Sequence, residues 1–164
     1  MVDDIVNYVD QGHDNVKDDA GPADIAPTIG AAGRAVIASM MARLSARGFD
    51  GMTPAFATLV PQLDATGARP SALAQRSGVS KQAMSKLLHE LETRGYVEQV
   101  ADPNDTRAKI VRLTRRGAAL RAACLEARGE LQALAAETLG KIKLARLQRD
   151  LAQLTAALSR PYHP

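Results

Sequence analysis

The chain has 164 residues, a formal net charge of +3, 3% aromatic residues, one cysteine and no tryptophan. This length suits one compact domain with a real core, and the scarcity of aromatics argues against an aromatic-rich β-sandwich and for a helical fold. The single Cys124 excludes an internal disulfide and fits a reducing cytoplasm. No apolar run approaches the roughly 18 residues that cross a membrane, and the acidic start is unlike a signal peptide, so we expect a cytoplasmic protein without a membrane partner.

Residues 1–27 form an acidic N-terminal extension, since they hold seven aspartates and Lys17, whereas the remainder has 20 Lys and Arg against 11 Asp and Glu. A basic body suits a polyanionic partner, although many equally basic proteins bind none. The extension is either a solvated tail or a short amphipathic helix with Val2, Ile5, Val6 and Val9 on one face. It could fold onto the basic body and compete with phosphate, or extend a dimer interface.

From Thr28 the pattern predicts helices. The first ends before Gly48 and carries an apolar stripe of Ile29, Gly33, Val36, Ile37, Met40, Met41 and Leu44. Thr53-Pro54 predicts the start of the next, because a threonine caps a helix and proline suits its first position. Its buried face should hold Phe56, Leu59, Val60 and Leu63, and Pro61 should end or kink it.

A short helix is expected from Pro70 to Gly78, with Leu73 and Ala74 inward, and a second from its N-cap Ser80 to Thr93 or Arg94. Residues 96–100 and 110–113 predict two strands around a turn at 102–105. Thr114 should cap a long helix that runs to about Glu137. After Gly140 a last helix ends before Pro161, with a coiled-coil-like seam of Leu147, Leu151, Leu154 and Leu158.

Two short helices followed by a hairpin predict a mainly α fold with a small β-hairpin wing, a winged helix-turn-helix. The second helix should bury Met84, Leu87, Leu88 and Leu91. Its opposite face carries polar side chains suited to phosphates and base edges, with Ser80, Lys81, Gln82, Ser85 and Lys86 nearest the N-terminal end that normally enters the major groove. By itself, this face could equally be the solvent face of an ordinary amphipathic helix.

The hairpin segment is more specific. The residues 91-LETRGYV-97, 102-DPNDTR-107 and 113-LTRRG-117 resemble the LExxGxV, DPxDxR and LTxxG pattern of the MarR (multiple antibiotic resistance regulator) family, over roughly residues 28–160. The resemblance implies that Arg107 enters the minor groove and that Asp105 holds its guanidinium, which suits the preference of arginine for a narrow minor groove. Alternatively, the pair only stabilises a turn.

Two positions depart from many relatives, which carry arginine where this chain has Thr106 and often where it has Gln99. We therefore expect fewer phosphate contacts and a shallower salt dependence. Four cations compensate or are simply solvated: Lys109, Arg112, Arg115 and Arg116.

The resemblance also implies a homodimer, with residues 28–52 and 114–160 as a helical dimerisation region and 53–113 as the DNA-binding lobe. A two-fold dimer would place its recognition helices about 34–36 Å apart on a pseudo-palindromic operator. By the same resemblance we expect a ligand-responsive repressor. A small aromatic or phenolic effector would lie against Met40, Met41 and Phe56, although methionines at helical spacing are more often core.

Other function classes find little support. The sequence has no Ser/His/Asp order, phosphate loop or paired-carboxylate signature, so we expect no enzyme and no cofactor. Cys124 lies between Ala123 and Leu125 and should be buried and inert. The scattered His13, His89 and His163 predict no metal site. The remaining alternative is a winged-helix protein-interaction module without specific DNA binding, against which the retained Lys81, Gln82, Lys86 and Arg107 argue.

Overall fold

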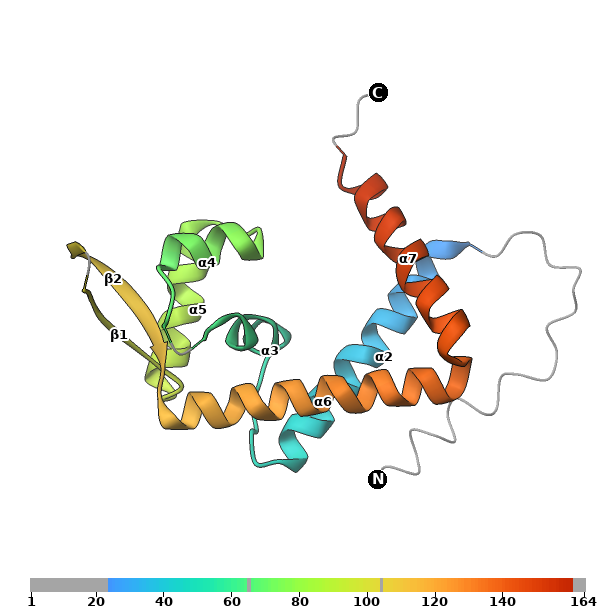
Figure 1. The fold of residues 1–164 in the computed structure, drawn as a ribbon, viewed down its shortest axis with the longest axis horizontal. Helices are drawn as coiled ribbons and strands as arrows, with labels where there is room; N and C mark the ends of the chain where they lie inside the picture. Colours follow the sequence, from blue (N-terminus) through green and yellow to red (C-terminus); the bar gives the residue numbers. More distant parts are fainter. Residues whose placement is uncertain (1–23, 65, 104, 161–164) are drawn as a thin grey trace, which may run out of the picture. The chain divides into compact units, whose positions relative to one another are not determined.

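The computed structural model describes residues 24–64, 66–103 and 105–160, so the predicted amphipathic segment at Val2–Val9 lies outside the described residues. The elements follow in the order α2 (Ile25–Ala46), α3 (Pro54–Leu59), the 3-10 turn η1 (Val60–Gln62), α4 (Pro70–Ser77), α5 (Lys81–Thr93), β1 (Val97–Asp102), β2 (Asp105–Leu113), α6 (Arg115–Leu139) and α7 (Lys141–Leu158) (Figure 1). The mainly α fold with a hairpin wing is confirmed.

The chain divides into two units, residues 1–35 and 36–164, with the boundary inside α2. This division does not test the predicted limits of the dimerisation region and the DNA-binding lobe, which stay predictions.

Helix α2 begins at Ile25, three residues before the predicted start, and the Asp24 carboxylate accepts a hydrogen bond from the Ala26 N–H at 3.0 Å. By length and composition alone this helix could cross a membrane, with a mean hydropathy of 1.3 over its most apolar window. The sequence analysis counted only uninterrupted apolar runs, and Arg34 and Arg43 interrupt this one. The same composition also suits a helix that packs against protein, so it is weak evidence for a membrane.

Three predicted helix starts are confirmed by their side-chain caps. The hydroxyl oxygens of Thr53, Ser80 and Thr114 accept hydrogen bonds from backbone N–H groups three residues on, at 3.3, 3.1 and 3.0 Å. Each such cap stabilises a helix by about 1 kcal/mol. Pro61 ends the α-helical part of its segment as predicted, because the chain tightens there into η1.

The core of residues 36–164 lies mainly among the helices and hairpin of residues 53–113, and Leu44 of α2 and Leu120 of α6 pack into it. The predicted inward faces are buried, except that Leu87 is only partly so. The largest buried side chains of this core are Tyr96, Phe56, Leu44, Leu63, Leu73, Met84, Leu88, Leu91 and Leu120. Leucine thus supplies most of these large side chains, in line with the scarcity of aromatic residues.

The wing is a two-stranded antiparallel sheet whose register runs from Val97 opposite Leu113 to Asp102 opposite Asp105. The predicted strands, 96–100 and 110–113, were too short, because Asp102 and Asp105, which the prediction put in the turn, belong to β1 and β2. Cross-strand pairing overrides the turn preference of aspartate here. Arg107 therefore lies on a strand rather than in a loop.

A third segment joins the sheet where Ala68 exchanges two backbone hydrogen bonds with Val111, at 3.0 and 2.9 Å. Gly67 makes this approach feasible. Its φ is +80°, and a Cβ atom there would lie 2.6 Å from the Val111 carbonyl oxygen. The turn that precedes α4 is thereby fixed against β2.

The start of α6 is fixed just as closely. A Cβ atom on Gly117 would lie 1.8 Å from the Tyr96 carbonyl oxygen, so only glycine fits there. The Thr114 hydroxyl donates to the Gly95 carbonyl at 2.6 Å while it caps α6. The LTxxG segment is therefore a structural joint between the end of α5, β1 and α6.

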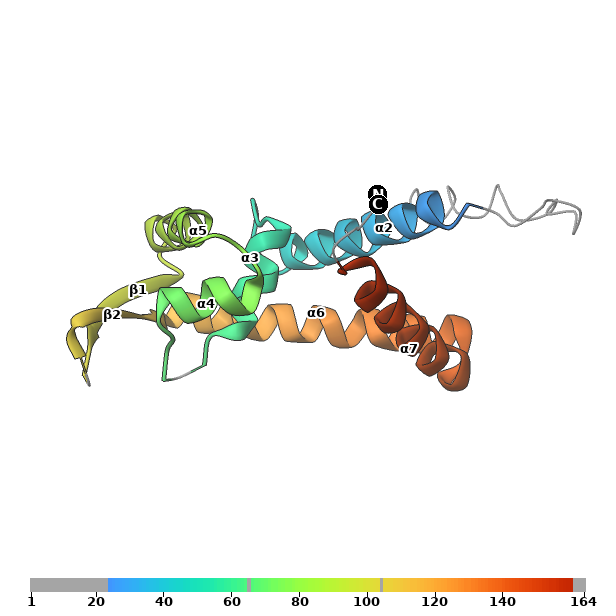
Figure 2. The same ribbon diagram turned by 90° about the horizontal axis from the view of Figure 1, so that it is seen from above.

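Helix α6 connects the lobe with α7. The hairpin meets α6 at its N-terminal end, and α7 leaves from its C-terminal end (Figure 2). Two arginines at the C-terminal end of α2 and just after it bind α6: Arg43 pairs with Glu130 at 3.1 Å, and Arg47, which follows α2, pairs with Glu126 at 3.6 Å and also with Glu130. In α7 only Leu144 is buried.

Candidate nucleic-acid interface

Helix α5 presents two different faces. Met84, Leu88 and Leu91 are buried against the core. Each of the residues that the sequence assigns to DNA contact on this helix is exposed: Ser80, Lys81, Gln82, Ser85 and Lys86. The structure thus gathers them on one polar surface that begins at the helix N-terminus.

The N-terminal end of α5 is suited to a negatively charged partner. Its first turn contains no acidic residue, and Lys81 adds a cation to the positive end of the helix dipole. The Ser80 oxygen is engaged as the cap, but the hydroxyl hydrogen can still be donated to a phosphate.

On the wing, the Arg107 side chain is exposed. Asp105 accepts a hydrogen bond from the Arg107 backbone N–H at 3.2 Å, and its carboxylate pairs with Arg69 at 3.5 Å. Among the described residues the guanidinium of Arg107 has no carboxylate partner. The expected contact between Asp105 and that guanidinium is replaced here by a contact with the Arg107 backbone.

Arg69 was not singled out from the sequence. Its Nε donates to Asp102 Oδ2 at 2.8 Å and its Nη2 lies 2.7 Å from the same oxygen. In the described part of the chain, Asp102 is the one charged residue that is buried. Because Arg69 immediately precedes α4, it ties the tip of the wing to the helix-turn-helix. No local signal reveals this pair, which spans 33 positions.

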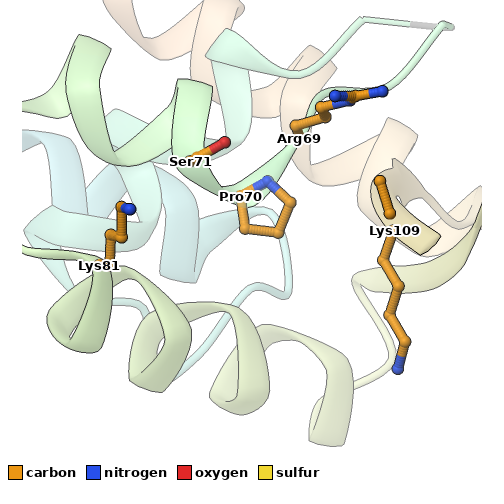
Figure 3. Close-up of a pocket in the computed structure, with 6 residues that line it drawn as sticks. Arg69, Pro70, Ser71, Lys81 and Lys109 are labelled. Carbon is orange, nitrogen blue, oxygen red and sulfur yellow. The ribbon is translucent and has the colours of Figure 1, made fainter. Parts of the chain in front are cut away.

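A cavity of about 350 Å³ lies beside this ion pair, between the starts of α4 and α5 and strand β2. Its lining residues are Arg69, Pro70, Ser71, Lys81, Ala108 and Lys109 (Figure 3). Figure 3 shows Lys81 and Lys109 on opposite sides of Pro70. The Arg69 guanidinium already pairs with Asp102 and Asp105. Of the three cations that line the cavity, Lys81 and Lys109 can therefore bind an anionic ligand.

Comparison with known proteins assigns this segment. Residues 50–108 match the family model described as "MarR family". Over this segment the chain is similar to the MarR family. No curated protein sequence matches the chain.

Solved MarR-family structures extend the likeness in fold over most of the chain. A mutant E. coli MarR complexed with operator DNA is 25% identical, with a TM-score of 0.66, covering 79% of this chain and 94% of its own. Streptococcus pneumoniae FabT in complex with DNA is 18% identical, with a TM-score of 0.72 and coverage of 82% and 94%. The S. aureus MepR–DNA complex is 16% identical, with a TM-score of 0.67 and coverage of 79% and 95%.

Gln99, one of the two positions where many relatives carry arginine, has a structural role of its own. The Gln99 side-chain amide donates a hydrogen bond to the Glu92 carboxylate at 2.9 Å, so this residue joins β1 to α5.

The cations suggested as compensation lie in different surroundings. The Arg116 guanidinium lies 4.7 Å from the centre of the Tyr96 ring and donates to the Tyr96 hydroxyl at 3.3 Å. Of the four cations suggested as compensation, Lys109 and Arg115 are exposed, whereas Arg112 is only half-exposed.

The residues suggested for effector binding do not all meet. Met40 and Met41 line a cavity of about 140 Å³ together with Val36, Ile37, Pro54, Ala57, Thr58 and Arg128. Phe56 does not line this cavity. It is fully buried in the core, with the Arg94 guanidinium 5.3 Å from its ring centre. This volume is below the roughly 300–1,000 Å³ usual for drug-sized ligands.

Cys124 is fully buried, as predicted. Burial raises the pKa of its thiol, against a smaller opposing effect of the Arg128 charge. A neutral, covered thiol is a poor nucleophile, which fits the prediction of an inert residue. Among the described residues no group of three or more His, Cys, Asp or Glu side chains could hold a metal ion, while His13 and His163 lie outside them.

Proposed function

We propose that the chain is a transcription regulator that binds double-stranded DNA in a sequence-specific manner as a homodimer. The observation that carries this proposal is the exposed polar surface of α5 next to a wing that presents Arg107. It is supported by the MarR-family match over residues 50–108 and by the likeness to a MarR structure that holds operator DNA.

In this proposal α5 enters the major groove. Gln82, Ser85 and Lys86 reach base edges or phosphates, because amide, hydroxyl and ammonium groups supply the required donors and acceptors. Arg107 enters the minor groove, where a narrow and electronegative groove favours a guanidinium. Asp105 acts indirectly, through the Arg107 backbone and through Arg69.

The cavity of Figure 3 would take a backbone phosphate. Lys81 and Lys109 bring two positive charges to it, and Ser71 is placed near the start of α4. Charge-assisted contacts of this kind set the position of the protein on DNA without reading its sequence. Lys109 would thereby offset part of the charge that is absent at Thr106.

The homodimer is supported by apolar side chains that the single chain leaves uncovered. On α6 and α7, Leu134, Leu139, Ile142 and Leu158 are between 38% and 87% exposed, and the seam residues Leu147 and Leu151 are 43% and 41% exposed. Large apolar side chains that are exposed along two successive helices are typical of an interface. Two-fold pairing would repeat the DNA-binding lobe and match a pseudo-palindromic operator.

A repressor role and release by a small aromatic or phenolic effector complete the proposal. The Met40–Met41 cavity, which includes exposed Val36 and Ile37, is the place where such an effector would bind if a second protomer closed it. Methionine side chains adapt readily to apolar ligands of different shape.

The direct test is an electrophoretic mobility shift on the upstream DNA of the gene that encodes the protein. Wild type should shift it in the presence of excess unrelated DNA, and Arg107→Ala should weaken specific binding by about tenfold or more. Arg149→Ala on α7, also exposed, is the matched control and should bind as wild type does. Equal binding by Arg107→Ala would refute the wing assignment. No specific shift by wild type would favour a protein-interaction module.

A further inference from the structure

A second basic cavity, of about 390 Å³, lies outside the surface described above. It is formed by the turn before α4, the end of β2 and the first turns of α6, and is lined by Asp64, Arg112, Leu113, Ala118 and Arg121. It shares no lining residue with the Lys81–Lys109 cavity or with the Met40–Met41 cavity. The proposed DNA contacts therefore do not use it.

Both arginines in this cavity lack a partner in the described part of the chain. The Nε atoms of Arg112 and Arg121 are buried without a hydrogen-bond acceptor, and neither guanidinium is within ion-pair distance of a described carboxylate. By contrast, Arg43, Arg47 and Arg69 each have one. Because both side chains line one cavity, the other N–H groups of the two guanidiniums can donate to a ligand that enters it.

Asp64 does not supply that acceptor. Its Oδ1 accepts hydrogen bonds from the Thr66 N–H at 2.9 Å, the Thr66 hydroxyl at 2.5 Å and the Gly67 N–H at 3.1 Å. The Thr66 hydrogen bonds hold the pKa of Asp64 below its usual value. The carboxylate is therefore directed to its own turn, and the close packing of Gly67 on Val111 keeps that turn in place.

We propose that this cavity binds a small organic anion, whose carboxylate or phosphate group is held by Arg112 and Arg121 and whose apolar part packs against Leu113 and Ala118. Two guanidinium groups provide planar donors that match an oxyanion. The volume lies within the roughly 300–1,000 Å³ of ligand pockets, which is more space than an inorganic ion needs. The bound anion would link the base of the wing to α6.

The test measures binding by isothermal titration calorimetry on the full chain without DNA, so it does not require specific DNA binding, and the arginine variants distinguish this cavity from the Lys81–Lys109 cavity. The probes are phenyl phosphate, hexanoate and inorganic phosphate at constant ionic strength. Phenyl phosphate or hexanoate should bind more tightly than inorganic phosphate, and whichever of these two binds identifies the oxyanion class. Arg112→Gln and Arg121→Gln should each weaken binding by about tenfold or more.

Two further variants keep the result decisive. Arg115→Gln removes the same charge from an exposed position of α6 and should bind the probes as wild type does. Ala118→Leu keeps both arginines, fills the cavity from an exposed helical position and should abolish binding. The proposal is overturned if wild type binds no probe, if Arg115→Gln loses affinity as much as Arg121→Gln, or if Ala118→Leu still binds. Equal affinity for inorganic phosphate would refute the apolar contact.

Discussion

The ion pair between Arg69 and Asp102 should contribute measurably to stability, and Arg69→Met tests this. The Asp102 side chain is 7% exposed and the Arg69 side chain 47% exposed. Breaking a fully buried pair costs about 3–5 kcal/mol, whereas an exposed pair contributes about 0–1 kcal/mol. Asp102 also keeps other interactions. We therefore expect an intermediate loss of about 1–2 kcal/mol in the free energy of unfolding.

The assay is urea unfolding at one fixed protein concentration, because dimerisation would make the midpoint depend on concentration. The matched control is Arg146→Met, which removes a pair with Asp150 at 3.7 Å whose side chains are 79% and 62% exposed. That variant should stay within about 0.5 kcal/mol of wild type. Equal stabilities of Arg69→Met and Arg146→Met would refute the argument. A double-mutant cycle with Asp102→Asn then isolates the coupling of the pair.

Three further predictions follow from single sites. Gly117→Ala should lower the free energy of unfolding by about 3 kcal/mol or more, because the new Cβ would lie 1.8 Å from the Tyr96 carbonyl oxygen. Gly129→Ala is the control: its Cβ would have nothing within 4 Å, so the variant should be neutral or stabilised by up to about 1 kcal/mol. Because burial raises the pKa of Cys124, its contribution is present below the unfolded value of 9.0 and is lost as the pH rises through the folded value. Thermal melts should therefore show a larger loss above pH 9 for wild type than for Cys124→Ala, and equal losses would contradict this. Thr106→Arg should steepen the slope of log K for DNA binding against log salt by about 0.9, and an unchanged slope would mean that the wing makes no phosphate contact there.

The sequence predicted the helix starts and the inward faces well, because both depend on local spacing. A capping hydroxyl and its N–H partner are three residues apart, as at Ser80 and Ala83. Apolar residues that repeat with the period of a helix, such as Met84, Leu88 and Leu91, share one face whatever surrounds the helix. These features needed no knowledge of the tertiary structure.

The features that the sequence did not predict depend on distant segments. The strands extend to Asp102 and Asp105 because each pairs across the hairpin, although their composition favours a turn. Arg69 pairs with Asp102 across 33 positions, and Asp102, which the sequence analysis predicts in a turn, is buried at the end of β1. Phe56, which the family resemblance suggests for effector binding together with Met40 and Met41, packs into the core instead.

The motif that carried the family resemblance separates into two parts with different physical roles. Asp102, Thr114 and Gly117 make contacts within the protein that fix the wing and α6. Arg107, by contrast, is exposed and makes no side-chain ion pair within the described residues. Most residues of the motif therefore stabilise the fold, and only a few are placed to contact DNA.

This separation predicts how variants should behave when stability and DNA affinity are measured together. Gly117→Ala should lower both the melting temperature and the affinity, because it disturbs the joint that positions the wing. Arg107→Ala and Lys81→Gln should lower the affinity while the melting temperature stays within about 2 °C of wild type, since exposed substitutions change stability by about 0.5 kcal/mol or less. If Arg107→Ala lost affinity only in proportion to a lower melting temperature, Arg107 would be a structural residue and DNA recognition would rest on α5 alone.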